Sequence, residues 1–152
     1  MKRTIALAAA ACTLAVPAIA FGQTFVGIYD GHIVSAPDTS VTVKFSGANQ
    51  PDGTTDVRLN RFVTHDLVVN CDDGVVATLD HAKLKGNVVV GSNGNFRVKD
   101  DNGKTLFKVS GHIGKNKAFG QFRLTGKITG TDNVVRECDS GRLGWVARPP
   151  KS

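Results

Sequence analysis

Two cysteines beyond the N-terminal apolar segment, Cys71 and Cys138, have the residue type and setting for a disulfide bond. Each stands between a stretch with β-branched residues and a tight-turn signal, which reads Asp72-Asp73-Gly74 in the first case and Asp139-Ser140-Gly141 in the second. Glycine accepts the positive φ that a tight hairpin loop requires, so both cysteines are expected at the mouths of hairpins. Their matched settings predict one bridge between two hairpin tips.

The second of these turns, Asp139-Ser140-Gly141, also has the residue types of the nucleophile segment of chymotrypsin-like serine proteases. Those enzymes resemble two barrels with a histidine motif upstream, and this chain is too short for that arrangement. No histidine of this chain stands in the matching context. A turn is the preferred interpretation, and a small hydrolase or isomerase with Asp and His on loops remains the enzymatic alternative.

Metal chemistry is not indicated by the four histidines, which are scattered singly along the chain. His65 and His81 each have an aspartate as a neighbour in sequence, but adjacent residues of a strand point to opposite faces, so neither pair chelates as a unit. The acidic run Asp100-Asp101-Asn102-Gly103 lacks the ligand spacing of a calcium loop and fits a hairpin turn instead. We therefore expect no cofactor and no metal.

Charge is distributed unevenly along the sequence. Residues 23–102 carry 7 basic and 10 acidic side chains, whereas residues 103–152 carry 10 basic and 3 acidic ones. Strand parity places several of the basic groups outward on neighbouring strands, and others at the turn between them. These residues form the predicted basic face: Lys108, His112, Lys115, Lys117, Arg123 and Lys127. Such a face attracts an anionic extracellular partner, although a solvated exterior would have the same composition.

The N-terminal residues 1–20 have the order of a secretory signal peptide: two basic residues, an apolar stretch and a small-residue pattern. Cleavage is expected after Ala20, with Gly22 as the alternative. A retained anchor is disfavoured because the apolar stretch is short and interrupted by Pro17. We therefore expect a secreted chain whose residues 21–152 form a single β domain, with no stable membrane span after cleavage.

Composition favours strands, because the chain has one glutamate and one methionine but abundant valine, threonine and glycine. The prediction is an all-β domain of about eight to ten antiparallel strands, either a sandwich or a closed barrel, with one disulfide. Residues 80–85 could form a helical turn, but their period of two favours a strand. Loops are expected at residues 35–40 and 47–55, where prolines and glycines gather.

Two hairpins can be given a register. A tight turn at Asp30-Gly31 would pair Ile28 with Ile33, and one at Asn102-Gly103 would pair Val98 with Phe107. Alternation along the later strands then predicts one shared core: Phe96, Val98, Phe107, Val109, Phe122, Leu124 and Trp145.

A group of motifs in the second half of the chain resembles uncharacterised small exported β-domain proteins of the actinobacterial type. The resemblance is strongest over residues 86–148 and rests on turn glycines, alternating aromatics, a late cysteine and a tryptophan. The segments that carry it are residues 94–96, 107–113, 118–122, 138–141 and 145–148. It implies a β fold, export and a disulfide, and it implies no activity.

Taken together, these features predict a secreted, non-enzymatic β-domain that binds an extracellular partner through its surface or loops. A β-barrel with an apolar cavity for a small ligand is an alternative, as is the small enzyme. A filled interior would favour the surface binder over the ligand carrier.

Overall fold

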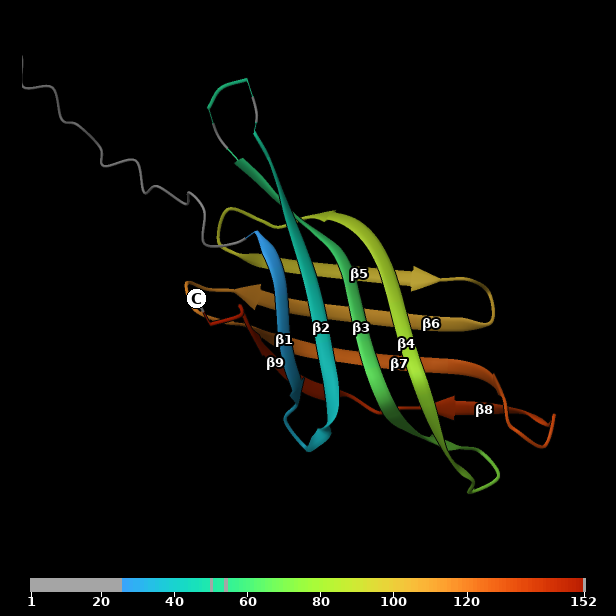
Figure 1. Cartoon of the computed structure of the whole chain (residues 1–152). Helices are drawn as coiled ribbons and strands as arrows, with labels where there is room; N and C mark the ends of the chain where they lie inside the picture. The colour runs from blue at the N-terminus through green and yellow to red at the C-terminus, as the bar shows by residue number, and fades with distance from the viewer. Residues whose placement is uncertain (1–25, 50, 54, 152) are drawn as a thin grey trace, which may run out of the picture.

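A computed structural model describes residues 26–49, 51–53 and 55–151. The predicted signal peptide, residues 1–20, and both predicted cleavage points lie outside the described residues. The described residues form nine strands (Figure 1), whose bounds are β1 Gly27–Ile33, β2 Ala36–Asn49, β3 Thr55–Cys71, β4 Val76–Val89, β5 Asn95–Asp101, β6 Thr105–Ile113, β7 Ala118–Thr129, β8 Val135–Asp139 and β9 Leu143–Arg148. No helix able to cross a membrane occurs among them.

Six of the strands close into an antiparallel barrel. The ring runs β1, β2, β3, β8, β7 and β9, and β9 pairs again with β1. Closure depends on two short strands, because β9 pairs with the first half of β7 and β8 pairs with its second half. The all-β prediction is thus confirmed, and the choice it left open is decided in favour of a closed barrel with extra strands.

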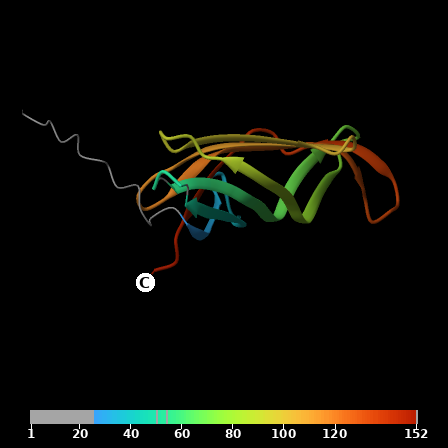
Figure 2. The same ribbon diagram turned by 90° about the horizontal axis from the view of Figure 1, so that it is seen from above.

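The extra strands turn this barrel into a flattened, two-layered body. β4 extends the sheet beyond β3, and β6 and β5 extend it beyond β7. Seen from above, β1 to β4 form one layer and β5 to β7 form the other (Figure 2). β4 and β5 end the strand order. Because the two layers face each other, their outer sides look in opposite directions (Figure 2).

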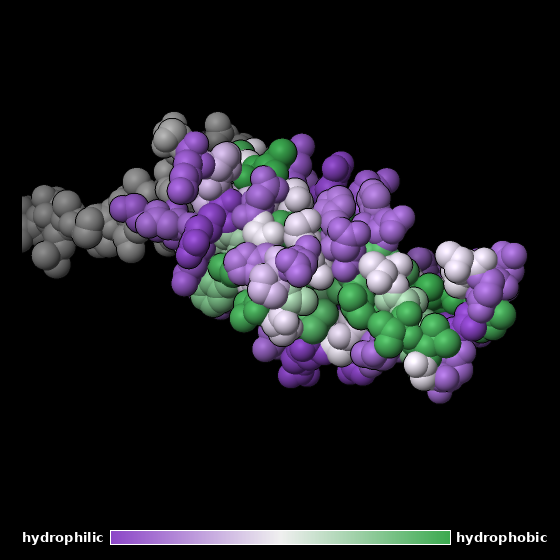
Figure 3. All heavy atoms as spheres, turned by 60° about the horizontal axis from the view of Figure 1, so that its bottom comes forward, coloured by the Kyte–Doolittle hydropathy of each residue, from purple (hydrophilic) through white to green (hydrophobic). Residues whose placement is uncertain are grey.

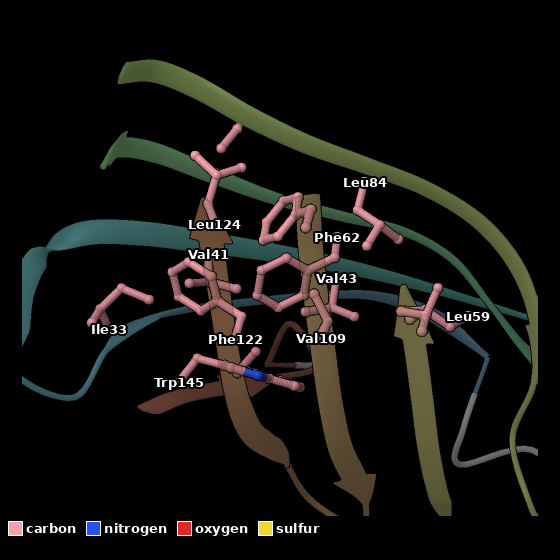
Figure 4. Close-up of a cluster of buried hydrophobic side chains, with 14 of the residues drawn as sticks. Ile33, Val41, Val43, Leu59, Phe62, Leu84, Val109, Phe122, Leu124 and Trp145 are labelled. Atoms are coloured by element: carbon pink, nitrogen blue, oxygen red, sulfur yellow. The ribbon is translucent and has the colours of Figure 1, made fainter. Parts of the chain in front are cut away.

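The core lies between these layers and is filled by aromatic rings. Figure 4 shows Phe62, Phe122 and Trp145 grouped together, and the ring of Phe62 lies 5.2 Å from that of Trp145 and 5.5 Å from that of Phe122. Such pairs add about 0.5–1.5 kcal/mol each beyond the area they bury. All seven predicted core residues are at most 7 % exposed, which confirms the predicted inward parity.

One row of the sheet shows how the rings are accommodated. Phe96, Gly111, Gly120 and Trp145 stand directly opposite one another across β5, β6, β7 and β9. The Phe96 and Trp145 rings are 6.2 Å apart, and a Cβ added to Gly111 would come within 2.8 Å of both. Gly111 therefore leaves the space that the two aromatic rings occupy, whereas a Cβ at Gly120 would meet the Ser110 carbonyl oxygen of β6 at 2.0 Å.

The predicted disulfide is present, but only Cys71 stands at a hairpin turn. The predicted hairpin after Cys138 is wrong, because residues 139–141 join β8 to β9, and these two strands both pair with β7 and not with each other. Cys71 and Cys138 are bonded, their Cα atoms are 3.9 Å apart, and they face each other in the ladder between β3 and β8. Arg136 lies two residues before Cys138. It donates to Asp73 in the β3–β4 turn at 2.5 Å and to Asp132 in the β7–β8 turn at 2.6 Å. These ion pairs hold the pKa of both carboxyl groups below the usual range. A disulfide is compatible with an extracellular protein.

The predicted hairpin at Asp30-Gly31 is wrong. β1 runs straight through these residues, pairing Gly31 with Val41 of β2 on one side and with Ala147 of β9 on the other. A Cβ at Gly31 would lie 1.8 Å from the Val146 carbonyl oxygen. The glycine is therefore needed for the close approach of β9 and not for a turn.

The predicted hairpin at Asn102-Gly103 exists, but its register is shifted by two residues. Val98 faces Val109, and Phe107 faces Asp100. The reason is a longer loop, in which Asn102 Oδ1 accepts the backbone N–H groups of Lys104 and Thr105. An even shift leaves every side chain on its predicted face, so the core is unaffected.

The two predicted loops are shorter than expected. β2 already begins at Ala36. The register shift between His32 and Ile33 leaves residues 37–39 of β2 without partners in β1, so Pro37 lies in a bulge, where its missing N–H is tolerated. β2 also continues to Asn49, and β3 starts at Thr55. Residues 80–85, expected as a strand, lie in β4.

Candidate functional site

The predicted basic face is the outer side of the layer formed by β5, β6 and β7. Lys108 on β6 stands directly between Lys99 of β5 and Arg123 of β7. All three side chains are exposed. Directly opposed residues of antiparallel strands have Cβ atoms roughly 5 Å apart, and like charges in such positions repel each other. The β sheet thus assembles a continuous cationic row across three strands.

Two cations at the ends of this row have carboxylate partners. Arg123 donates through Nε and Nη2 to both carboxylate oxygens of Asp139, and this pairing lowers the pKa of Asp139. Lys99 Nζ lies 3.4 Å from Asp101. Among the described residues, Lys108 has no ion-pair partner. The row therefore has its least neutralised charge at its centre.

Lys127 is separated from that row. It lies four residues beyond Arg123, directly opposite Glu137 of β8, and its Nζ is 3.9 Å from the Glu137 carboxylate. Arg123 and Lys127 thus belong to one strand but are each matched by an acid of the neighbouring strand. The sequence could not show this, because those acids become neighbours only when β8 pairs with β7.

The other predicted residues gather at the opposite end of β6 and β7. His112 faces Phe119, and its Nδ1 is 2.9 Å from Asn95 Oδ1. Lys117 Nζ lies 5.2 Å from the centre of the Phe119 ring, a cation–π distance. Lys115 is exposed in the same turn. Phe119 is 42 % exposed, so a cationic and aromatic group stands at the edge of the face.

A second cationic cluster, which the sequence analysis did not single out, lies on the outer side of the other layer. Lys44, Arg61 and Lys85 stand directly opposite one another across β2, β3 and β4. Lys83 lies beside them on β4, opposite Val63. We call these four residues the β2–β4 cluster. They escape a sequence search because they come from the half of the chain with net negative charge; their shared outward parity is the signal that could have found them.

A cleft of about 300 Å³ opens between the edge of β4 and the layer of β5 to β7. Its apolar lining includes Ala82, Phe107 and Leu124, all buried. His81 and Asp100 line it as well. It lies beside the aromatic core and not within the barrel, whose interior is occupied by packed rings.

Apolar surface gathers at the end of the molecule that carries the β3–β4 and β7–β8 turns. Figure 3 shows it at the right-hand end of the face in view. The exposed valines of these two hairpins are Val68, Val75, Val76, Val134 and Val135. They surround turns that also carry acidic side chains, so this end differs in character from the two cationic faces.

The remaining candidate groups have structural roles in the described residues. Ser140 Oγ donates to the Gly141 carbonyl and accepts the N–H of Leu124, so the hydroxyl is engaged in the turn. Asp139 Oδ1 accepts the N–H of Gly141, as in an Asx turn. The rings of His65 and His81 lie 5.1 Å apart. No group of three or more potential metal ligands occurs among the residues that the structure describes.

No protein-family model, curated protein or solved structure matches this chain. The resemblance to small exported β-domain proteins stays a prediction, and function must be argued from the surfaces themselves.

Proposed function

We propose that this chain is a secreted, non-enzymatic binding domain that docks on an anionic extracellular surface through the outer side of β5, β6 and β7. The observation that carries the proposal is the cationic row centred on Lys108, directly opposite Lys99 and Arg123. Like charges in directly opposed positions reduce sheet stability by roughly 0.2–1 kcal/mol, so an anionic ligand that bridges them removes a cost of the free protein.

The neighbouring residues extend this docking face. Lys115 and Lys117 add two exposed cations at the β6–β7 turn, and Phe119 adds an exposed ring among them. The filled aromatic interior supports a role for the outer surface in preference to a ligand held inside the barrel. Export is supported by the signal-like N-terminal sequence and by the disulfide bond.

The test is retention of the mature protein on an immobilised anionic matrix such as heparin. We expect retention at low ionic strength and release as salt rises, because the screening length falls from ~30 Å at 0.01 M to ~8 Å at 0.15 M. The variant K108Q/K115Q/K117Q should elute at clearly lower salt. This variant keeps the Arg123–Asp139 and Lys127–Glu137 ion pairs, so neither acid loses its cationic partner.

The matched control is K104Q/R142Q/K151Q, which removes the same charge at exposed positions outside both the row of Lys99, Lys108 and Arg123 and the β6–β7 turn. It should elute close to the wild type. Equal shifts in both variants would mean that net charge alone governs retention, and an unretained wild type would refute the proposal outright.

A second candidate function is binding of a small ligand in the cleft beside β4. The cleft volume of about 300 Å³ reaches the lower end of the range for small-molecule sites, and its mixed polar and apolar lining is open to one side. A thermal-shift screen of small amphipathic compounds tests this. Any stabilising compound should lose its effect in Thr105→Trp, which fills the cleft, and a persistent effect would place the ligand elsewhere.

A further inference from the structure

The β2–β4 cluster is less neutralised than the predicted basic face. Among the described residues, none of Lys44, Arg61, Lys83 and Lys85 forms an ion pair. All four side chains are exposed. By contrast, the row on the opposite layer has carboxylate partners at both of its ends. The cluster therefore concentrates unpaired positive charge on one side of the molecule.

Its geometry follows from the register of three strands. Neighbouring strands are roughly 4.8 Å apart, so the row from Lys44 through Arg61 to Lys85 spans roughly 10 Å. Lys83 stands two residues along β4, roughly 7 Å from Lys85. The nearby guanidinium of Arg61 lowers the pKa of Lys83, with smaller contributions from partial burial and Lys85. The neighbouring cations of the cluster therefore disfavour the charged form of Lys83.

No acid among the described residues forms an ion pair with the β2–β4 cluster. Asp56 pairs with Arg58 at 3.9 Å. Asp30 lies in β1 and accepts a hydrogen bond from Thr42. Asp80 lies on β4 between Leu79 and Ala82, where the alternation of buried and exposed side chains shifts by one residue. An external anion is therefore the group that can balance the four cations.

We infer that the β2–β4 cluster is a second anion-binding site, that its ligand is a linear acidic polysaccharide, and that the domain is bivalent and cross-links such chains. This inference rests on the proposed function for its first site and names the ligand class. Two sites on the outer sides of opposite layers cannot lie on one flat surface. They can engage two segments of flexible polymer at once.

Hydroxyl side chains next to the cluster suit a carbohydrate. Thr42 and Ser46 flank Lys44 on the same side of β2. The Thr42 hydroxyl donates to Asp30 and can still accept a hydrogen bond from a sugar hydroxyl, and Ser46 can donate or accept one. A row of cations crossing three strands also matches a chain that carries negative charges at intervals along its length. Guanidinium and ammonium groups both bind sulfate and carboxylate oxygens, and Arg61 can do so with two parallel bonds.

The experiment is a titration of the mature protein with a short heparin-derived oligosaccharide, measured by calorimetry. The wild type should bind two oligosaccharides, and K44Q/R61Q/K85Q should bind one. K108Q/K115Q/K117Q should also bind one, and the control K104Q/R142Q/K151Q should bind two. With long heparin chains, only the wild type and the control should produce turbidity, because cross-linking requires both sites.

The outcomes separate this inference from the proposed function. If K44Q/R61Q/K85Q binds as many oligosaccharides as the wild type, the second site is refuted while the first can stand. If K44Q/R61Q/K85Q loses one site and K108Q/K115Q/K117Q loses none, the cluster is a site and the proposed face is not. Binding to anionic lipid vesicles without oligosaccharide binding would refute the ligand class.

The melting temperature of K44Q/R61Q/K85Q is a second readout, which shows whether this variant is still folded. Because like charges directly opposite one another destabilise a sheet, K44Q/R61Q/K85Q should melt at a higher Tm than the wild type. A lower Tm would mean that the cations have stabilising partners within the fold, which contradicts the premise of the site.

Discussion

Gly111→Ala is expected to destabilise the protein strongly although it adds only one methyl group. The new Cβ would lie 2.7 Å from Phe96 Cζ, 2.8 Å from Trp145 Cζ2 and 2.8 Å from the Phe119 carbonyl oxygen. These distances are well inside van der Waals contact, and one of the three atoms belongs to the backbone. The two rings are packed against the rest of the core, so neither can turn away freely.

The magnitude follows from two opposing effects. Replacing a strand glycine by alanine gains about 0.5–1 kcal/mol when the site has room, because the unfolded chain loses freedom. Overpacking a well-filled core costs typically 1–3 kcal/mol and occasionally more. Three simultaneous close contacts put Gly111→Ala near the upper end, and we expect a net loss of about 2–3 kcal/mol.

Gly144→Ala is the matched control. Gly144 also lies in a strand, but a Cβ there would meet its nearest atom, Val34 Cγ2, at 3.7 Å, which is ordinary contact. This variant should gain stability by about 0.5 kcal/mol. Urea unfolding, followed by circular dichroism and by the fluorescence of Trp145, the single tryptophan, measures both. Equal stabilities of the two variants would refute the claim that glycine at position 111 makes room for the rings.

Three further predictions concern the disulfide, a buried hydroxyl and an ion-pair network. Replacing Cys71 and Cys138 together by alanine should cost roughly 4 kcal/mol on the chain-entropy estimate for a 67-residue separation, and a urea-measured loss below about 1 kcal/mol would contradict it. Thr64 Oγ1 is buried without a hydrogen-bond partner among the described residues, so Thr64→Val should raise the free energy of unfolding by about 1 kcal/mol; a decrease would show that the hydroxyl has a partner. Arg136→Gln should remove the influence that lowers the pKa of the two carboxyl groups it bridges. Because those groups have a pKa of about 3.9 when unfolded, the stabilisation is present above that pH and is lost as the pH falls through their lower folded values. The stability gap between wild type and variant should therefore be constant near neutral pH and shrink in acid, and a pH-independent gap would contradict the assignment.

Local patterns were enough to predict the all-β fold class and, from Phe96 onward, which side of the strands is buried. The parity of Phe107, Val109 and Phe122 predicts the core face correctly, because successive side chains of a strand point to opposite sides whatever the partner. The turn at Asn102-Gly103 and the turn after Cys71 are likewise local properties. The predicted hairpin after Cys138 is wrong, because the pairing of β8 and β9 with β7 is decided far away in sequence. Register was less accessible, as the two-residue shift at that turn shows, since it depends on how the loop hydrogen-bonds.

The two candidate surfaces divide in the same way. The sequence by itself determined that Lys108, Arg123 and their neighbours point outward, and that the second half of the chain is rich in cations. Only the tertiary structure decided that β8 brings Asp139 to Arg123, and that β2, β3 and β4 bring Lys44, Arg61 and Lys85 into one unpaired row. The physical reason is that the direction of a side chain follows from the geometry of its own strand, whereas its electrostatic partners come from strands far away in sequence, and those are chosen when the barrel closes.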